Sequence, residues 1–481
     1  MHTITGKPTK VLSVFSLVMI NVIAVDSLRT LPISAEYGSA VIIFYAIATL
    51  AFLMPIALVA AELATTWPRT GGIYVWIREA FGENIGFWAI WLQWIYNVVW
   101  FPTIMVFMAS TLAFLINPEL TNHKVYLITA TILLFWIATI FNCFGMRVAS
   151  IVSTIGALVG TIIPMVFIVI LGCCWVYAGK PAHITFSSAA MLPDFHHLSN
   201  LAFFVAVLFG LVGLEMSAVH AEEVRDPQRD YPRALFFSAI IIVLSLTLAS
   251  LAIAIIVPRS ELSLVSGLLD AFSIFFKTYN MAWMMPVMAI LIFIGAICGV
   301  SAWIIGPTKG LLSAGRDGCL PPWLYRVNRH HAPVNLLIVQ GVIFTILCSV
   351  FLLFPTINSS YWFLSALTAQ LALIVYILMF AAAIKLRYKV THAPRAYKIP
   401  GGKRIIWLVC GVGILSCLMG IILGFVPPDN LEIPNILIYE LLLINGMLFF
   451  SVPPFILYAK RKAHWRELTV TNQAQFKRPE L

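Results

Sequence analysis

Long apolar stretches alternate with short polar ones along the whole chain. About twelve of these stretches reach the length of a membrane-spanning helix, which needs about 20 mostly apolar residues to cross the hydrocarbon core of a bilayer. They cover residues 11–31, 38–61, 86–116, 124–142, 151–178, 199–221, 235–257, 282–308, 334–354, 361–384, 405–426 and 435–458. Runs such as 240–257 lack the alternation of a transmembrane β-strand. The pattern therefore predicts an all-α polytopic membrane protein of about 12 transmembrane helices.

Composition agrees with a lipid environment. Of the 481 residues, 61% are hydrophobic and 10% are charged, whereas soluble domains carry roughly 25% charged residues. The net charge of +10 does not indicate nucleic acid binding, because 25 of the 30 Lys and Arg residues fall on one side of the predicted helices. Four lie on the other side, at Lys124, Lys180, Arg259 and Lys277. By the positive-inside rule, both termini are predicted to be cytoplasmic.

The first apolar stretch is interpreted as a helix and not as a signal peptide. It contains Asp26 and Arg29 and has no convincing cleavage site of small residues. The eight cysteines form no Cys-x-x-Cys pair, so we expect no metal site, no redox site and no cofactor. Lipid and small molecules are the expected partners, and the oligomeric state is left open.

Two of the predicted helices carry polar residues and helix breakers in the middle of a span. In the first helix they come directly after Val25 and are Asp26, Ser27, Arg29 and Pro32. In the sixth helix they are Gly210, Gly213 and Glu215. An offset of five helices reverses direction across the membrane, and paired broken helices of this kind indicate a substrate site between inverted repeats. The freed amides and carbonyls suit a carboxylate and an ammonium, which an amino acid combines.

The ionisable residues in these breaks have alternative explanations. Asp26 and Arg29 either neutralise each other or contact a substrate, and Glu215 either bonds freed backbone amides or meets a substrate or proton. Glu215, Asp26 and His220 are the candidates for proton coupling, although a lone histidine is more often a hydrogen-bonding residue. Glu62, at the end of the second helix, is attributed to solvation at the membrane interface.

Several loops then resemble a known family. The motifs PRTGGIYVW at 68–76 and RDGCLPPW at 316–323 resemble loops of the amino acid–polyamine–organocation (APC) superfamily. Five further segments are similar to its bacterial glutamate/GABA antiporter branch: GLEMSAVH at 213–220, DYP at 230–232, SAWIIGP at 301–307, IPGGK at 399–403 and VPPDN at 426–430. The resemblance covers nearly the whole chain.

The resemblance implies an architecture and an activity. It implies a ten-helix 5+5 inverted-repeat transport core over residues 11–386, with discontinuous helices 1 and 6. Two further helices and their preceding cytoplasmic loop would occupy residues 387–458, between cytoplasmic tails at 1–10 and 459–481. It also implies amino acid antiport by alternating access, in the inner (plasma) membrane of a bacterium, with no enzymatic activity. Trp303 matches the tryptophan that gates the substrate in the family.

The pocket residues depart from that branch. Where the antiporters have a glutamate four residues before the gate tryptophan, this chain has Gly299, and their two tyrosines of helix 10 correspond to Ile374 and Leu378, with Tyr376 displaced. The substrate therefore need not be glutamate or GABA, and a larger or more apolar amino acid is our hypothesis. With Val25, Asp26, Ser27, Arg29, Gly210, Gly213, Glu215 and Trp303, these positions complete the candidate substrate site.

Other functions remain as alternatives. A proton-coupled amino acid symporter uses the same pocket, but some proton-coupled relatives carry a lysine in helix 5, and residues 151–178 have none in their membrane portion. A sensor that binds amino acids without moving them cannot be separated by sequence, although the short tails leave no room for a signalling domain. A haem carrier or hydrolase is disfavoured, because the chain shows neither paired intramembrane histidines nor a Gly-x-Ser-x-Gly motif. A channel is disfavoured, because the polarity within the predicted spans is concentrated at the two helix breaks.

Overall fold

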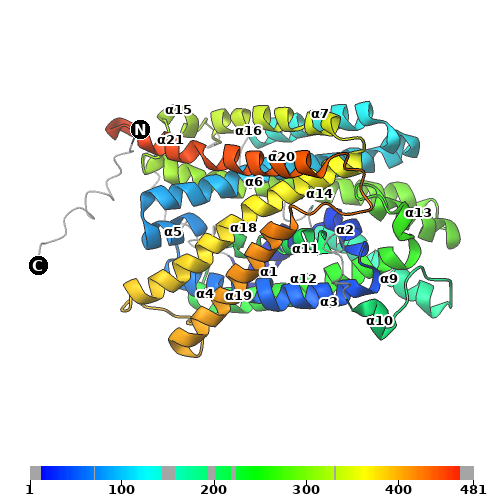
Figure 1. Cartoon of the computed structure of the whole chain (residues 1–481), viewed down its shortest axis with the longest axis horizontal. Helices are drawn as coiled ribbons and strands as arrows, with labels where there is room; N and C mark the ends of the chain where they lie inside the picture. The colour runs from blue at the N-terminus through cyan, green and yellow to red at the C-terminus, as the bar shows by residue number, and fades with distance from the viewer. Residues whose placement is uncertain are drawn as a thin grey trace, which may run out of the picture.

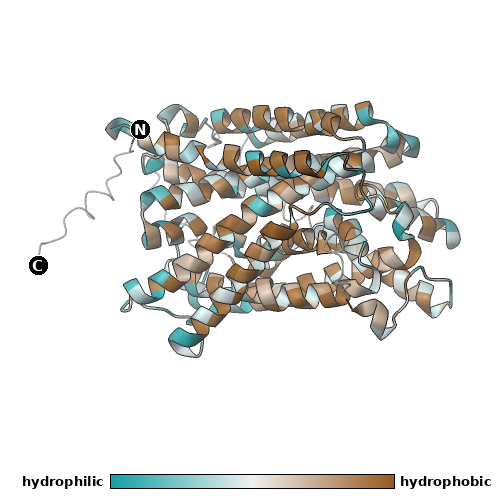
Figure 2. Cartoon of the chain, in the orientation of Figure 1, coloured by the Kyte–Doolittle hydropathy of each residue, from teal (hydrophilic) through white to brown (hydrophobic). Residues whose placement is uncertain are grey.

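The computed structural model describes residues 12–69, 71–143, 156, 158–192, 201–217, 224–329 and 332–465. Within these ranges the regular structure is helical, apart from one isolated bridge between Leu12 and Val224. The helices run roughly along the long axis of Figure 1 and are apolar over most of their length, as the brown ribbons of Figure 2 show. The predicted all-α membrane fold is confirmed.

The helices of the first half include both short and membrane-spanning elements. They are α1 (Val14–Val25), α2 (Leu31–Ala35), α3 (Val41–Ala48), α4 (Met54–Thr66), α5 (Ile73–Phe81), α6 (Glu83–Ile116), α7 (Lys124–Cys143), α9 (Ile163–Tyr177), α10 (Ser188–Met191) and α11 (Phe204–Gly210). Short 3-10 or π segments adjoin several of them, including η1 (Leu28–Thr30), η3 (Thr49–Leu53), η4 (Pro118–Asn122) and η5 (Leu158–Ile162).

The second half is built in the same way. Its helices are α12 (Pro227–Ile256), α13 (Gly267–Thr278), α14 (Met284–Arg316), α15 (Pro322–Tyr325), α16 (Val334–Leu347), α17 (Val350–Leu353), α18 (Ile357–Lys389), α19 (Gly402–Leu423), α20 (Ile436–Ser451) and α21 (Pro453–Ala459). Among the described residues, 11 helices are long and apolar enough to cross a membrane. The sixth predicted span corresponds to a shorter apolar helical segment, Phe204–Ser217.

Burial separates a central group of helices from a peripheral one. The apolar windows of the spans that contain α6 and α18 are each 78% buried, whereas those of α19 and of α20 with α21 are 33% and 17% buried. In Figure 1, α6, α14 and α18 cross the middle of the molecule, and α6 packs against both of the others. The outer helices leave large apolar side chains exposed, including Leu408 and Leu437, as expected for a surface in contact with lipid.

Both predicted helix breaks are present. Helix α1 ends at Val25, and Asp26 and Ser27 are extended before the chain turns into η1 and α2. Helix α11 ends at Gly210, and after a turn the chain is helical again from 214 to 217. The turn ends at Gly213, whose φ of +115° is a conformation that favours glycine.

Glu62 is held by two arginines in the protein interior. Its side chain is 5% exposed, Arg387 forms a two-pronged contact with its carboxylate, and Arg395 Nε lies 3.2 Å from Oε1. The backbone N–H of Ile399 donates to Oε2 at 2.9 Å. The prediction that interfacial solvent accounts for Glu62 is therefore wrong, because ion pairing within the protein stabilises this charge.

Candidate substrate-binding site at the two helix breaks

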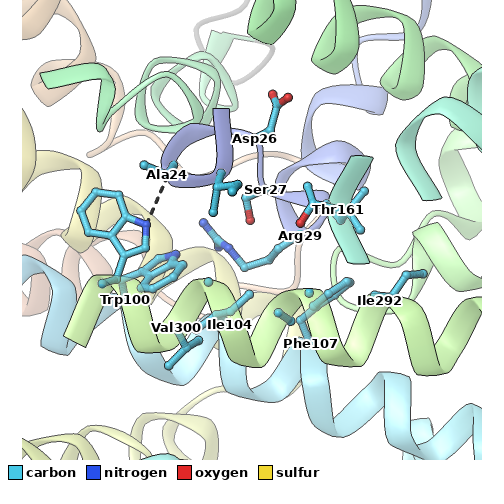
Figure 3. Close-up of a pocket in the computed structure, with 16 residues that line it drawn as sticks. Ala24, Asp26, Ser27, Arg29, Trp100, Ile104, Phe107, Thr161, Ile292 and Val300 are labelled. Atoms are coloured by element: carbon cyan, nitrogen blue, oxygen red, sulfur yellow. Dashed lines mark hydrogen bonds between the residues drawn. The ribbon is translucent and has the colours of Figure 1, made fainter. Parts of the chain in front are cut away.

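Two small cavities lie where the broken helices meet α6 and α14. The first has a volume of about 50 Å³ and the second about 30 Å³, which leaves room for a few water molecules. Ser27, Arg29, Trp100 and Trp303 line both cavities. The second also reaches the break of the sixth helix, through Phe209, Gly210 and Val212. Figure 3 shows how the side chains around the first cavity converge.

Arg29 is fixed at the centre of this site. Its side chain is buried, and Nη1 donates to Thr103 Oγ1 at 3.1 Å and to the Tyr361 hydroxyl at 3.0 Å. The Tyr361 hydroxyl donates in turn to the Arg29 carbonyl at 3.2 Å. Since Thr103 belongs to α6 and Tyr361 to α18, these bonds hold the guanidinium between the first break and two central helices.

The charge of Arg29 is not neutralised by a carboxylate in the part of the chain that the structure describes. Aromatic rings surround it: its guanidinium carbon lies 5.8 Å from the Trp100 ring centroid, 5.9 Å from that of Phe209 and 5.5 Å from that of Tyr361. Its Nε has no hydrogen-bond partner. Cation–π contacts recover part of the cost of burying a charge, and a buried cation without a counter-ion marks a candidate site for an anion.

Asp26 faces another helix. Ser245 Oγ in α12 donates to Asp26 Oδ2 at 2.9 Å, and Figure 3 shows the carboxylate pointing away from Arg29. Oδ1 has no partner among the described residues. The alternative in which Asp26 and Arg29 neutralise each other is not what this structure contains.

Glu215 supports the break of the sixth helix. It is buried, and the Tyr376 hydroxyl donates to its Oε2 at 2.7 Å. The same hydroxyl accepts the backbone N–H of Gly213 at 3.0 Å. Glu215 lines neither cavity, and both alternatives for this residue, a structural role and a role in substrate or proton binding, stay predictions.

Trp303 contacts both breaks. Its Nε1 donates to the carbonyl of Ala24 at 3.2 Å, the dashed line of Figure 3, and so binds a carbonyl at the end of the interrupted helix. A Cβ atom on Gly213 would lie 3.0 Å from its ring. The Trp303 ring centroid also lies 6.0 Å from that of Trp100. This is a position from which the ring could cover the cavities, and gating by Trp303 stays a prediction.

Three further candidates line the cavities. Val25 and Gly210 line the second cavity, and Gly299 lines the first. A Cβ atom built on Gly299 meets no other atom within 4 Å. The structure therefore brings these residues together with Arg29 and Trp303.

The remaining candidates lie elsewhere. Ile374 and Leu378 are half-buried in α18 and line neither cavity, while Tyr376 between them turns toward Glu215. Their part in substrate binding stays a prediction. His220 lies outside the described residues.

Sequence reasoning missed the residues that hold the two charges of the first break. Thr103 and Tyr361 bind Arg29, and Ser245 binds Asp26. Each is one of several hydroxyl residues in a long, mostly apolar span, and such residues are common in membrane helices. Their spacing carries no signal, because the packing of three separate helices brings them to the break.

A further acidic residue lies between the first two membrane-spanning segments. Glu36 follows α2, outside the membrane-spanning helices, and its carboxylate accepts from Arg259 Nε at 3.1 Å and from Asn430 Nδ2 at 3.0 Å. Burial raises the pKa of Glu36 to about 7, although Arg259 acts in the opposite direction. Glu36 lines a further cavity together with Tyr37 and His183.

We expect Glu36→Gln to change how stability depends on pH. Because the folded protein holds the Glu36 proton more tightly than the unfolded chain, this residue lowers the free energy of unfolding as the pH rises from 4.5 to about 7. The melting temperature in detergent should therefore fall more between pH 5 and pH 8 for the parent than for the variant. Glu261→Gln is the control, because Glu261 is exposed in the 3-10 segment Arg259–Glu261. An equal fall in parent and Glu36→Gln would contradict the assignment.

The fold and the site together define a class of protein. A membrane protein of long apolar helices, with small cavities between two interrupted helices, has the architecture of a secondary transporter. The model of the amino acid permease family matches residues 10–449. The chain belongs to this family.

Similar proteins include several bacterial transporters. The chain is 57% identical to an uncharacterised transporter of Legionella pneumophila subsp. pneumophila, over 94% of this chain and 97% of that protein. It is 30% identical to a glutamate/gamma-aminobutyrate antiporter of Lactococcus lactis subsp. lactis, over 93% and 90% of the two chains. A probable agmatine/putrescine antiporter of the same organism is 23% identical over 82% and 83%.

Proposed function

We propose that this protein exchanges amino acids across a bacterial plasma membrane by alternating access, with Arg29 binding the substrate carboxylate. The observation that carries the proposal is the buried guanidinium of Arg29, which has no counter-ion among the described residues and has a free Nε. A carboxylate in the adjoining cavities would pair this charge. The similarity to antiporters supports exchange over uptake alone.

The substrate proposed here is an amino acid with an apolar or bulky side chain. The first cavity is bounded by Ile104, Phe107 and Ile292, and Gly299 leaves open space where a side chain would otherwise stand. The first cavity, at about 50 Å³, requires the helices to separate before a substrate enters, as alternating access demands. With the Lys- and Arg-rich loops in the cytoplasm, both termini would be cytoplasmic.

Proton-coupled symport is the second candidate. It is favoured by the buried carboxyls of Asp26 and Glu215, each of which has one oxygen without a partner in the described part of the chain. In that case these two residues would carry the proton, and a proton gradient would drive uptake in place of the exchange of one amino acid for another. A sensor with the same pocket would bind amino acids and move none.

Counterflow in proteoliposomes separates these functions. Vesicles holding the protein are loaded with one unlabelled amino acid and supplied with a labelled one outside, over a panel of the twenty L-amino acids and GABA. We expect uptake that requires an internal amino acid and is strongest for apolar ones. Uptake into empty vesicles driven by a pH gradient would establish symport instead. A preference for glutamate over all neutral amino acids would contradict the proposed substrate.

A further inference from the structure

A larger cavity opens at the end of α6 that carries η4 and α7. Its volume is about 350 Å³, within the range of about 300–1,000 Å³ of small-molecule sites. Three segments enclose it: η4 with the start of α7, the loop ahead of α13, and the start of α18. Most of the lining is polar, and its hydroxyl and amide side chains are Ser110, Thr121, Asn122, Ser263, Ser266, Thr356 and Asn358. We call this space the outer cavity.

Lys124 supplies the outer cavity with a positive charge. Its side chain is half-buried, and Nζ donates to the carbonyl of Phe354 at 2.8 Å, a contact that holds the ammonium beside the cavity wall. No carboxylate pairs with it in the described ranges. An ammonium group has three donors, so Lys124 retains hydrogen-bonding capacity for an anion.

Two further features point to a ligand in the same space. Ser110 in α6 is 0% exposed and lines the outer cavity, and its hydroxyl has no hydrogen-bond partner among the described residues. The first residues of α18, Ile357 and Asn358, also line it. The amino end of a long helix carries a partial positive charge that favours an anion.

The outer cavity lies in line with Arg29. Ser110 is seven residues beyond Thr103 on α6, and Asn358 is three residues before Tyr361 on α18. These offsets are about two turns and one turn of helix, or roughly 10 Å and 4.5 Å along the axes. Thr103 and Tyr361 are the two side chains that hold the guanidinium of Arg29.

One aromatic side chain stands between the two sites. Phe107 is one turn from Thr103 and one turn from Ser110, on the same side of α6, and it lines the first central cavity. Residues spaced three and four apart share a helix face. A molecule passing from the outer cavity to Arg29 along this face would therefore cross Phe107.

We propose that the outer cavity is a second substrate site, in which Lys124 binds the carboxylate of an amino acid before the molecule passes Phe107 and reaches Arg29. The ammonium of the same amino acid would meet the side-chain oxygens of the cavity, such as Asn358 Oδ1 and Thr356 Oγ1. This inference rests on the proposed function for the identity of the ligand. It assigns Lys124, on the face predicted to be external, to capture and not to the central site.

The charge of the outer cavity can be tested by thiol reactivity, without a transport assay. In the full-length protein carrying Asn358→Cys, we would measure how fast the introduced thiol reacts with anionic 2-sulfonatoethyl and cationic 2-(trimethylammonium)ethyl methanethiosulfonate. Peptide mass spectrometry separates this thiol from the exposed Cys173 and Cys174. Adding Lys124→Gln should slow the anionic reagent about fivefold and speed the cationic one. Rates that do not depend on Lys124 would overturn the site.

Transport then tests the use of the site. Lys124→Gln should raise the KM of the amino acids found by counterflow about fivefold or more on the outer face, and leave the inner KM and kcat unchanged. Lys277→Gln, an exposed lysine of α13 that does not line the cavity, is the matched control. Equal KM values of parent and variant on both faces would overturn the proposal, as would a lower kcat alone.

Binding separates this proposal from that for the central site. L-leucine or L-glutamate should protect the thiol of Asn358→Cys from reagent in the parent background and also with Arg29→Ala, which removes the central charge. Protection that persists in Arg29→Ala and is lost in Lys124→Gln supports two sites. Protection lost with Arg29→Ala but kept with Lys124→Gln overturns the outer site. Normal transport by Arg29→Ala would instead contradict the proposed function, while the reagent rates still report on the outer cavity.

Discussion

Replacing Arg29 with alanine is expected to weaken amino acid binding and exchange strongly while leaving a folded protein. The lost charge-assisted bonds to a carboxylate are worth about 1.5–3 kcal/mol, which corresponds to a roughly 10- to 150-fold weaker affinity. Folding should survive, because the variant removes a buried cation that has no counter-ion among the described residues. Binding and counterflow are measured beside the melting temperature in detergent.

Two comparisons decide whether the carboxylate is what Arg29 recognises. Decarboxylated amines lack that group, so Arg29→Ala should affect them much less than it affects amino acids. If the parent moves such amines as well as the amino acids themselves, the assignment fails. Arg29→Lys keeps the charge but not the planar fork of donors, and we expect it to recover part of the binding. Arg259→Ala, which alters an exposed arginine outside the cavities at the helix breaks, is the control for a general charge effect.

The sequence predicts the spans and the breaks well because both are local properties. Apolar length alone locates the membrane helices, and each predicted span coincides with helical structure where the chain is described. The largest differences are at α12, which begins at Pro227 and not at 235, and at α14, which ends at Arg316 and not at 308. The break of the first helix follows from Asp26, Ser27 and Pro32 within one short stretch, and that of the sixth from Gly210 and Gly213.

The hydrogen-bond and ion-pair partners of these polar residues lie on other helices, far away in sequence, and were not predicted. Arg29 and Asp26 are three residues apart, yet they bond to different helices. Arg29 reaches α6 and α18, while Asp26 reaches Ser245 on α12. Glu62 at the end of a helix looks solvated in the sequence, but residues 325 or more positions away neutralise it. Such pairings depend on how helices pack, and hydropathy does not encode that.

The candidate pocket likewise contains some positions that were predicted correctly and others that were not. Gly299 and Trp303, placed by resemblance, do lie beside Arg29 on the first cavity. The helix 10 positions, Ile374 and Leu378, do not line it, since the face of α18 at that depth presents Tyr376 to Glu215. A resemblance transfers the course of the backbone more securely than the direction of each side chain.

A close contact between two glycines forms one wall of the site. A Cβ atom on Gly160, in η5, would lie 2.3 Å from the backbone nitrogen of Gly295 and 2.3 Å from the carbonyl oxygen of Leu291, both in α14. Thr161 and Gly295 line the first cavity beside this contact. Small residues allow membrane helices to approach in this way, so the width of the site depends on the absence of side chains here.

We expect Gly160→Val to prevent this packing. The clash is with backbone atoms, which cannot rotate away as a flexible side chain would, so the cost should reach or exceed the roughly 1–3 kcal/mol of ordinary overpacking. The variant should lose most of its monodisperse protein in size-exclusion chromatography, and any remainder should melt at a lower temperature than the parent. Gly299→Ala is the matched control, since it adds a methyl group to α14 one turn away, where nothing lies within 4 Å. If Gly160→Val elutes and melts as the parent does, the two helices can separate at this point, and the contact does not set the dimensions of the site.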